Sequence, residues 1–206
     1  MSPLDFSLKA KVINSLGYSQ SKVPHSIDVD IDKALEHIAD VANFRYRSLP
    51  YSSLARIPDF LTKKEYHSIG NKLLESFFFA ATLGHGVDRA IKKFSSMSLS
   101  LAVIMNTIAN ILLEIEVERV TNSNQSLFCP GYSGTELSDN RQILNILEAK
   151  KYLGIHTTNS GMMIPEKSMA GLLLKDYTFT CKGCQIIKNC DFLKNKTTCY
   201  AKKTEQ

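Results

Sequence analysis

The chain has 206 residues, of which 44% are hydrophobic and 22% charged, and its formal net charge is +5. This composition is typical of a globular protein with a sizeable core and argues against an intrinsically disordered chain. The small positive excess comes without an RNA-binding or helix-turn-helix pattern, so we interpret it as surface charge and expect no nucleic-acid partner. No signal peptide is visible, and polar residues interrupt the most apolar stretch, 101–113, so we expect a soluble cytoplasmic protein without a membrane span.

The first 75 residues give weak structural signals. Residues 1–30 predict an irregular or partly stranded lead-in, and Asp30 is placed to cap a first helix. Two prolines and several serines predict a loop over 45–58. A second short helix is expected over 62–74.

The pattern becomes clearer from residue 76 onward. Residues 76–82 are short, apolar and aromatic, which predicts a buried strand. A helix is expected to begin near Gly86. The segment 97–121 is the clearest helix, because its apolar residues form one continuous stripe. The stripe consists of Leu101, Ile104, Met105, Ile108, Leu112 and Ile115.

A polar stripe runs along the same long helix. Asn106, Asn110 and Glu114 are spaced four residues apart and therefore share one helix face. Such a face is either exposed to solvent or directed at a binding site, and exposure is the more usual case.

The remaining elements complete a mixed fold. Residues 122–138 predict a loop, Asp139 is placed to cap the next helix, and Gly154 is placed to end it. Residues 155–158 and 168–174 are predicted to form a terminal pair of strands. This order favours an α+β fold, a single domain with a bent, mainly antiparallel sheet flanked by helices and followed by a Cys-rich tail.

Four of the five cysteines crowd near the C-terminus, at Cys181, Cys184, Cys190 and Cys199. The CxxC pair can aim two thiolates at one ion, and four thiolates complete a zinc site or hold an iron–sulfur cluster. The later spacings fit neither a standard zinc ribbon nor a ferredoxin, so Zn, [4Fe-4S] and free thiols all remain open. We therefore divide the chain into a domain, 1–178, and a metal-binding tail, 179–206.

The loop Pro130-Gly131-Tyr132 suggests ligand binding. A glycine lets the backbone approach a ligand closely, and a proline stiffens that approach. The flat face and hydroxyl of Tyr132 suit a cofactor edge or a sulfonium group. Cys129 is expected to be a packing residue rather than a nucleophile, and no spacing predicts a catalytic triad.

The chain from about Phe77 to Leu174 resembles the activation, or reactivation, domain of cobalamin-dependent methionine synthase, in a stand-alone form. No single shared motif is specific to this family, but the order and spacing of the motifs are. The motifs are Pro130-Gly131-Tyr132, Ile146-Leu147, Gly154-Ile155, Thr157-Thr158-Asn159-Ser160, and Met163-Ile164-Pro165 followed by Ser168-Met169-Ala170-Gly171.

The resemblance implies a reactivation factor for a cobalamin-dependent methyltransferase, an accessory rather than a complete enzyme. In this family the domain presents S-adenosylmethionine to cobalamin that has been oxidised to cob(II)alamin. An electron donor reduces the cobalt, and the methyl group moves to it. The resemblance implies Pro130, Gly131, Tyr132, Glu114 and His156 as cofactor-binding residues.

The implied partners are a corrinoid protein or truncated methionine synthase, which holds the cobalamin, and an electron-transfer protein. The alternative is a Cys-cluster protein, with Fe–S or Zn, that uses the same fold only as an interaction scaffold. One departure bears on the ligand. The family typically has an arginine that pairs with the carboxylate of S-adenosylmethionine, and Leu127 occupies that position here. A leucine cannot form this bidentate contact.

Overall fold

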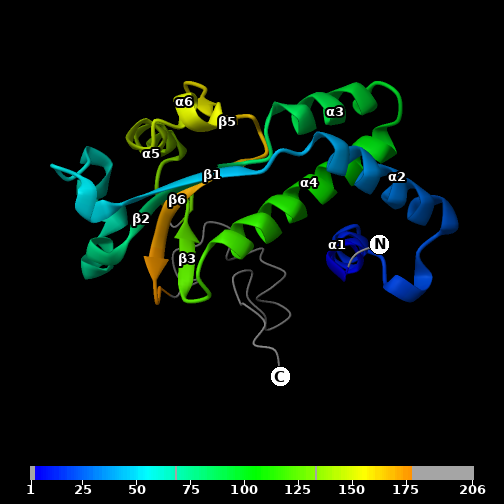
Figure 1. The fold of residues 1–206 in the computed structure, drawn as a ribbon, viewed down its shortest axis with the longest axis horizontal. Coiled ribbons are helices and arrows are strands. Elements are labelled where there is room, and N and C mark those ends of the chain that lie inside the picture. The colour runs from blue at the N-terminus through cyan, green and yellow to red at the C-terminus, as the bar shows by residue number, and fades with distance from the viewer. Residues whose placement is uncertain (1–2, 68, 133, 178–206) are drawn as a thin grey trace.

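A computed structural model describes residues 3–67, 69–132 and 134–177. A four-stranded antiparallel sheet in the order β1-β2-β6-β3 forms its centre (Figure 1). Its strands are β1 (Arg45–Pro50), β2 (Phe77–Thr82), β3 (Gln125–Phe128) and β6 (Ser168–Lys175). A second, two-stranded sheet pairs β4 (His156–Thr157) with β5 (Met163–Ile164). The predicted α+β class and antiparallel sheet are confirmed.

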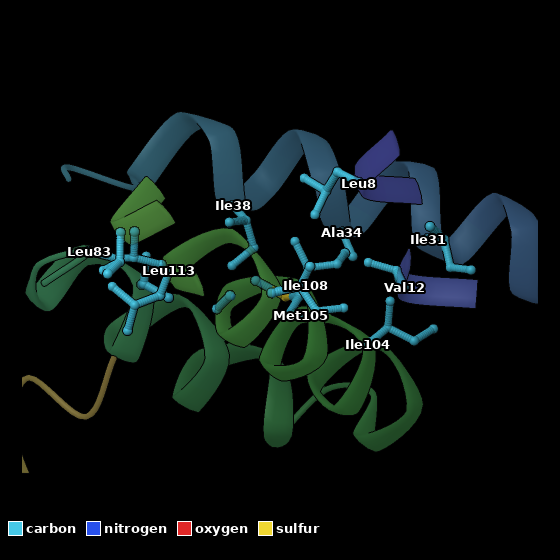
Figure 2. Close-up of a cluster of buried hydrophobic side chains, with 14 of the residues drawn as sticks. Leu8, Val12, Ile31, Ala34, Ile38, Leu83, Ile104, Met105, Ile108 and Leu113 are labelled. Atoms are coloured by element: carbon cyan, nitrogen blue, oxygen red, sulfur yellow. The ribbon is translucent and has the colours of Figure 1, made fainter. Parts of the chain in front are cut away.

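Four helices pack together in a layer on one side of the sheet, and the last of them contacts strand β2. They are α1 (Pro3–Ser15), α2 (His25–Val41), α3 (His85–Ser95) and α4 (Leu99–Val120). Helix α4 packs against the other three and against β2, and Figure 2 shows the apolar side chains that meet between them. The predicted strand 76–82 and the predicted helices from Gly86 and over 97–121 are confirmed. The irregular lead-in over 1–30 is wrong, because Leu8 and Val12 bury one side of α1 in this core.

Short 3₁₀ turns and two small helices cover the other face. Successive strand residues point to opposite faces, so Phe79 joins the α1–α4 core while Phe78 joins the second core. The second core includes Phe60 and Tyr66 from the turns η3 (Asp59–Thr62) and η4 (Lys64–Tyr66). Those turns, with η5 (Gly70–Glu75), replace the helix expected over 62–74. Helices α5 (Asn140–Ile146) and α6 (Ala149–Leu153) complete this layer.

Three predictions about strands are corrected. Residues 45–50 form edge strand β1 rather than a loop, and Pro50 lies at its last position, where a missing N–H disturbs the ladder least. Strand β3 lies within the expected loop 122–138. Strand β4 pairs with β5, whereas β6 lies between β2 and β3 in the main sheet, so 155–158 and 168–174 are not partners. The single helix predicted between Asp139 and Gly154 is divided into α5 and α6, with Glu148 between them at φ of 47°. Its predicted end at Gly154 is confirmed, with φ of 72°.

Among the described residues, α4 is the one helix long and apolar enough to cross a membrane by length and composition. Of its most apolar window, 44% is buried inside the structure. The core helix of a soluble protein meets the same criterion. The contacts of α4 with α1, α2, α3 and β2 account for this burial.

Candidate functional site

The Pro130-Gly131-Tyr132 loop follows β3 directly and is closed by its own hydrogen bonds. Gly131 has φ of 91°, in the region that favours glycine. The Gly131 N–H donates to Thr135 Oγ1 at 3.1 Å, and Thr135 Oγ1 donates to the Tyr132 carbonyl at 2.6 Å. Pro130 and Thr135 are buried, whereas Tyr132 is 67% exposed. The loop therefore has a fixed base and presents an aromatic side chain at the surface.

A buried carboxylate anchors the loop from below. Asp139 has a side chain only 3% exposed; its Oδ1 accepts from Lys63 Nζ at 2.7 Å and its Oδ2 from the Tyr66 hydroxyl at 3.0 Å. Burial, and then the charge of Asp139, raise the pKa of Tyr66 well above its ordinary value, so the hydroxyl stays protonated as a donor. The Thr135 side chain lies near the Tyr66 hydroxyl and opposes this rise in the Tyr66 pKa, so the cluster lies beside the loop.

The sequence predicted that Asp139 caps the next helix; the helix does begin directly after it, but its side chain does not cap it. Asp139 has helical backbone angles, and its side chain makes no cap hydrogen bond. Its hydrogen bond with Lys63 raises the pKa of Lys63, followed by the hydrogen bond from the same lysine to Glu136. Sequence reasoning missed this cluster because Asp139 lies more than seventy residues from both Lys63 and Tyr66 along the chain.

Two glycines bring other parts of the shared motif against the loop region. A Cβ on Gly171 would overlap the carbonyl oxygen of Phe128, so a glycine in β6 permits its close approach to the start of the loop. A Cβ on Gly161 would overlap the backbone of Leu137. Asn140 Nδ2 also donates to the Gly161 carbonyl at 3.2 Å. The segments 129–140, 157–161 and 168–171 therefore meet in space.

Cys129 lies at the base of the loop. Burial raises the pKa of its thiol to about 12, so the group is a neutral thiol at physiological pH. A nucleophilic cysteine needs the opposite shift. The environment of Cys129 is that of a packing residue.

Leu127 directs its side chain toward the core formed by α1–α4, against which it is partly buried. The position that carries an arginine in the family therefore supplies no cation here. The Tyr132 side chain is exposed, whereas the Leu127 side chain packs inside.

Glu114 and His156 lie on separate elements. Glu114 is only partly exposed on α4, and partial desolvation of its carboxylate, followed by the charge of Glu118, raises its pKa. His156 is exposed on β4 and lines an open cleft of about 600 Å³ beside α5 and α6. The lining of this cleft includes Arg141, Asn145, Glu148, Lys151 and Thr157 but neither the Pro130-Gly131-Tyr132 loop nor Glu114.

The polar stripe of α4 is not simply solvated. Asn106 Oδ1 and Asn110 Oδ1 accept from Lys167 Nζ at 2.6 and 2.8 Å. Lys167 is only 8% exposed, and burial lowers its pKa. Sequence reasoning missed Lys167, although it lies within the shared motif, directly before Ser168.

The cysteines of the predicted metal site, Cys181, Cys184, Cys190 and Cys199, lie outside the described residues. Their metal binding stays a prediction. Within the described part of the chain, no three His, Cys, Asp or Glu side chains gather as ligands for an ion.

No protein-family model and no curated protein matches the chain. Among solved structures, the chain is similar to the crystal structure of the MetH reactivation domain bound to AdoHcy, with a TM-score of 0.45 and 15% sequence identity. The likeness covers 76% of this chain and 69% of that chain. A likeness of this degree carries no argument about ligand or activity.

Proposed function

We propose that the chain is a reactivation factor for a cobalamin-dependent methyltransferase, acting on a separate corrinoid protein. The Pro130-Gly131-Tyr132 loop would position S-adenosylmethionine, and the partner would hold the cobalamin. One observation carries the proposal. The segments of the shared motif, 129–140, 157–161 and 168–171, meet in space, and the first of them carries the exposed Tyr132.

The chemistry of the loop supports this role. An exposed aromatic face attracts a cation, and the sulfonium of S-adenosylmethionine is one. Thr135 closes the base of the loop through its own hydrogen bonds, and the buried Tyr66–Asp139 pair lies beside it. A fixed loop can orient a methyl donor, which is the contribution that a protein makes when the corrinoid performs the transfer itself.

The surface around the loop suits an apolar partner. Tyr132, Leu137 and Met162 are large apolar or aromatic side chains that remain exposed. Leu137 lies beside Gly131 and against Gly161, the residue before Met162. Exposed apolar side chains that gather in this way commonly mark an interaction surface. We assign this surface, defined by Tyr132, Leu137 and Met162, to the corrinoid protein.

The proposal is tested with the full-length chain, a corrinoid protein loaded with cob(II)alamin, a one-electron donor and S-adenosylmethionine, all under anaerobic conditions. The expected result is loss of the cob(II)alamin absorption band that requires the chain. Tyr132→Ala should slow this loss roughly five- to thirtyfold, because a cation–π contact contributes about 1 to 2 kcal/mol.

Tyr152→Ala is the matched control, since Tyr152 is also exposed but lies on α6, where Arg47 stacks on it. The proposal requires this variant to behave like the unmodified chain. Loss of the band at the same rate without the chain, or equal effects of the two tyrosine variants, would contradict it.

A further inference from the structure

The contact between α4 and the start of β6 holds a lysine in an unusual setting. We infer that Lys167, together with Asn106 and Asn110, binds the carboxylate of a small-molecule ligand. The inference rests on the proposed function for the identity of that ligand, S-adenosylmethionine. The site itself is argued from its own contacts.

Lys167 is a buried cation with neutral partners. Two of the three donors of its ammonium group go to the amide oxygens of Asn106 and Asn110. Among the described residues, no carboxylate forms an ion pair with it. Asp88 and Glu166 are close enough for their charges to oppose the fall in its pKa, but burial dominates. A buried charge is normally paired, so this one has an anion still to accept.

The lysine is also held in place by its backbone. The Lys167 carbonyl accepts from the Leu83 N–H at 2.9 Å and from Thr82 Oγ1 at 3.3 Å. Ser168 Oγ lies 2.9 Å from Thr82 Oγ1 and 2.7 Å from the Pro165 carbonyl oxygen, so its hydroxyl can donate to either. A cation fixed in this way loses little entropy when an anion binds.

The composition of the site selects the class of anion. It offers one positive charge, and the amide groups of Asn106 and Asn110 add N–H donors without further charge. The single ammonium donor that is left favours a singly charged carboxylate over a phosphate dianion, because the negative charges of Asp88 and Glu166 also act at this lysine. Asn110 is exposed, so the site is open to solvent on that side.

The position of Lys167 suits a ligand that also touches the loop. Lys167 precedes Gly171 by four residues, and Gly171 packs on the start of the loop at Phe128. In an extended strand four residues span about 13 Å. An adenosyl amino acid can extend over such a distance, with its carboxylate at one end. Leu127 supplies no competing cation for that carboxylate.

The test compares S-adenosylmethionine with its decarboxylated analogue by calorimetry on the full-length chain. Lys167→Met should weaken binding of S-adenosylmethionine about 10- to 100-fold, the range for a hydrogen bond to a charged group. The same substitution should leave the affinity for the decarboxylated analogue unchanged. Lys175→Met, at the far end of β6 in an exposed pair with Glu75, should change neither affinity.

Asn110→Asp provides a second variant that keeps the lysine. A carboxylate at position 110 would pair with Lys167 and compete with the ligand, so affinity for S-adenosylmethionine alone should fall. The inference would be overturned if Lys167→Met and Asn110→Asp lost affinity equally for both ligands. It would also be overturned if these variants lost affinity for neither ligand.

Failure of the proposed function gives a different result, in which the unmodified chain binds neither ligand. The carboxylate site is then tested on its own by measuring the thermal unfolding midpoint in sodium acetate and in sodium chloride at equal ionic strength. A midpoint that is higher in acetate for the unmodified chain, but not for Lys167→Met, would support the carboxylate site. Equal midpoints in the two salts would exclude it.

Discussion

Asp139 should contribute far more to stability than its neighbour Glu136, although both carboxylates bind the same lysine. Lys63 Nζ lies 2.7 Å from Asp139 and 2.9 Å from Glu136. Asp139→Ala leaves the buried Tyr66 hydroxyl without its acceptor, which costs about 1 to 3 kcal/mol. Loss of the charge-assisted bond to partly exposed Lys63 raises the expected total to about 2 to 4 kcal/mol.

The free energy of unfolding is measured by urea denaturation with an unchanged m-value. Glu136 is exposed, so Glu136→Gln should leave the urea midpoint close to that of the unmodified chain. Tyr66→Phe should fall between the two, because it removes the hydroxyl but leaves Asp139 paired with Lys63. The reasoning is refuted if Asp139→Ala and Glu136→Gln shift the midpoint equally.

Three further predictions concern the strand β6, the buried thiol and the tail. Gly171→Ala should destabilise the fold by about 1 to 3 kcal/mol, since its methyl group would overlap the Phe128 carbonyl; an unchanged urea midpoint would show that the contact is looser. Cys129 should react with iodoacetamide at neutral pH far more slowly than a cysteine in an unfolded control, as measured by mass spectrometry, because its raised pKa leaves almost no thiolate. Anaerobically purified chain should contain bound metal in the tail, 179–206. A visible absorption band bleached by dithionite would indicate an iron–sulfur cluster, and stoichiometric zinc without the band would indicate a structural zinc site. Absence of both the band and zinc would contradict metal binding.

The parts of the fold that local sequence determines were predictable. Helix α4 has an apolar stripe at helical spacing, and β2 is an apolar run short enough for a strand, so both could be placed. Strands β1 and β3 could not, because they are polar or very short. Their stability comes from pairing with β2 and β6, which a local pattern does not encode.

The candidate site divides in the same way. The Pro130-Gly131-Tyr132 loop is visible in the sequence because its residue types are unusual together. The partners of Asp139 and Lys167 are not visible, since each lies more than fifty residues away along the chain. A spacing of four residues correctly grouped Asn106 with Asn110, but only the tertiary structure shows the lysine that they bind.

Hydrogen–deuterium exchange of the full-length chain, with and without S-adenosylhomocysteine, tests most directly whether the loop is the ligand site. The product is chosen because it carries the same carboxylate and adenosine but transfers no methyl group. We predict slower exchange in peptides covering 128–135 and 166–171 and no change in 141–157, which contains the cleft beside His156. Protection confined to 141–157, or no protection anywhere, would contradict the assignment of the site.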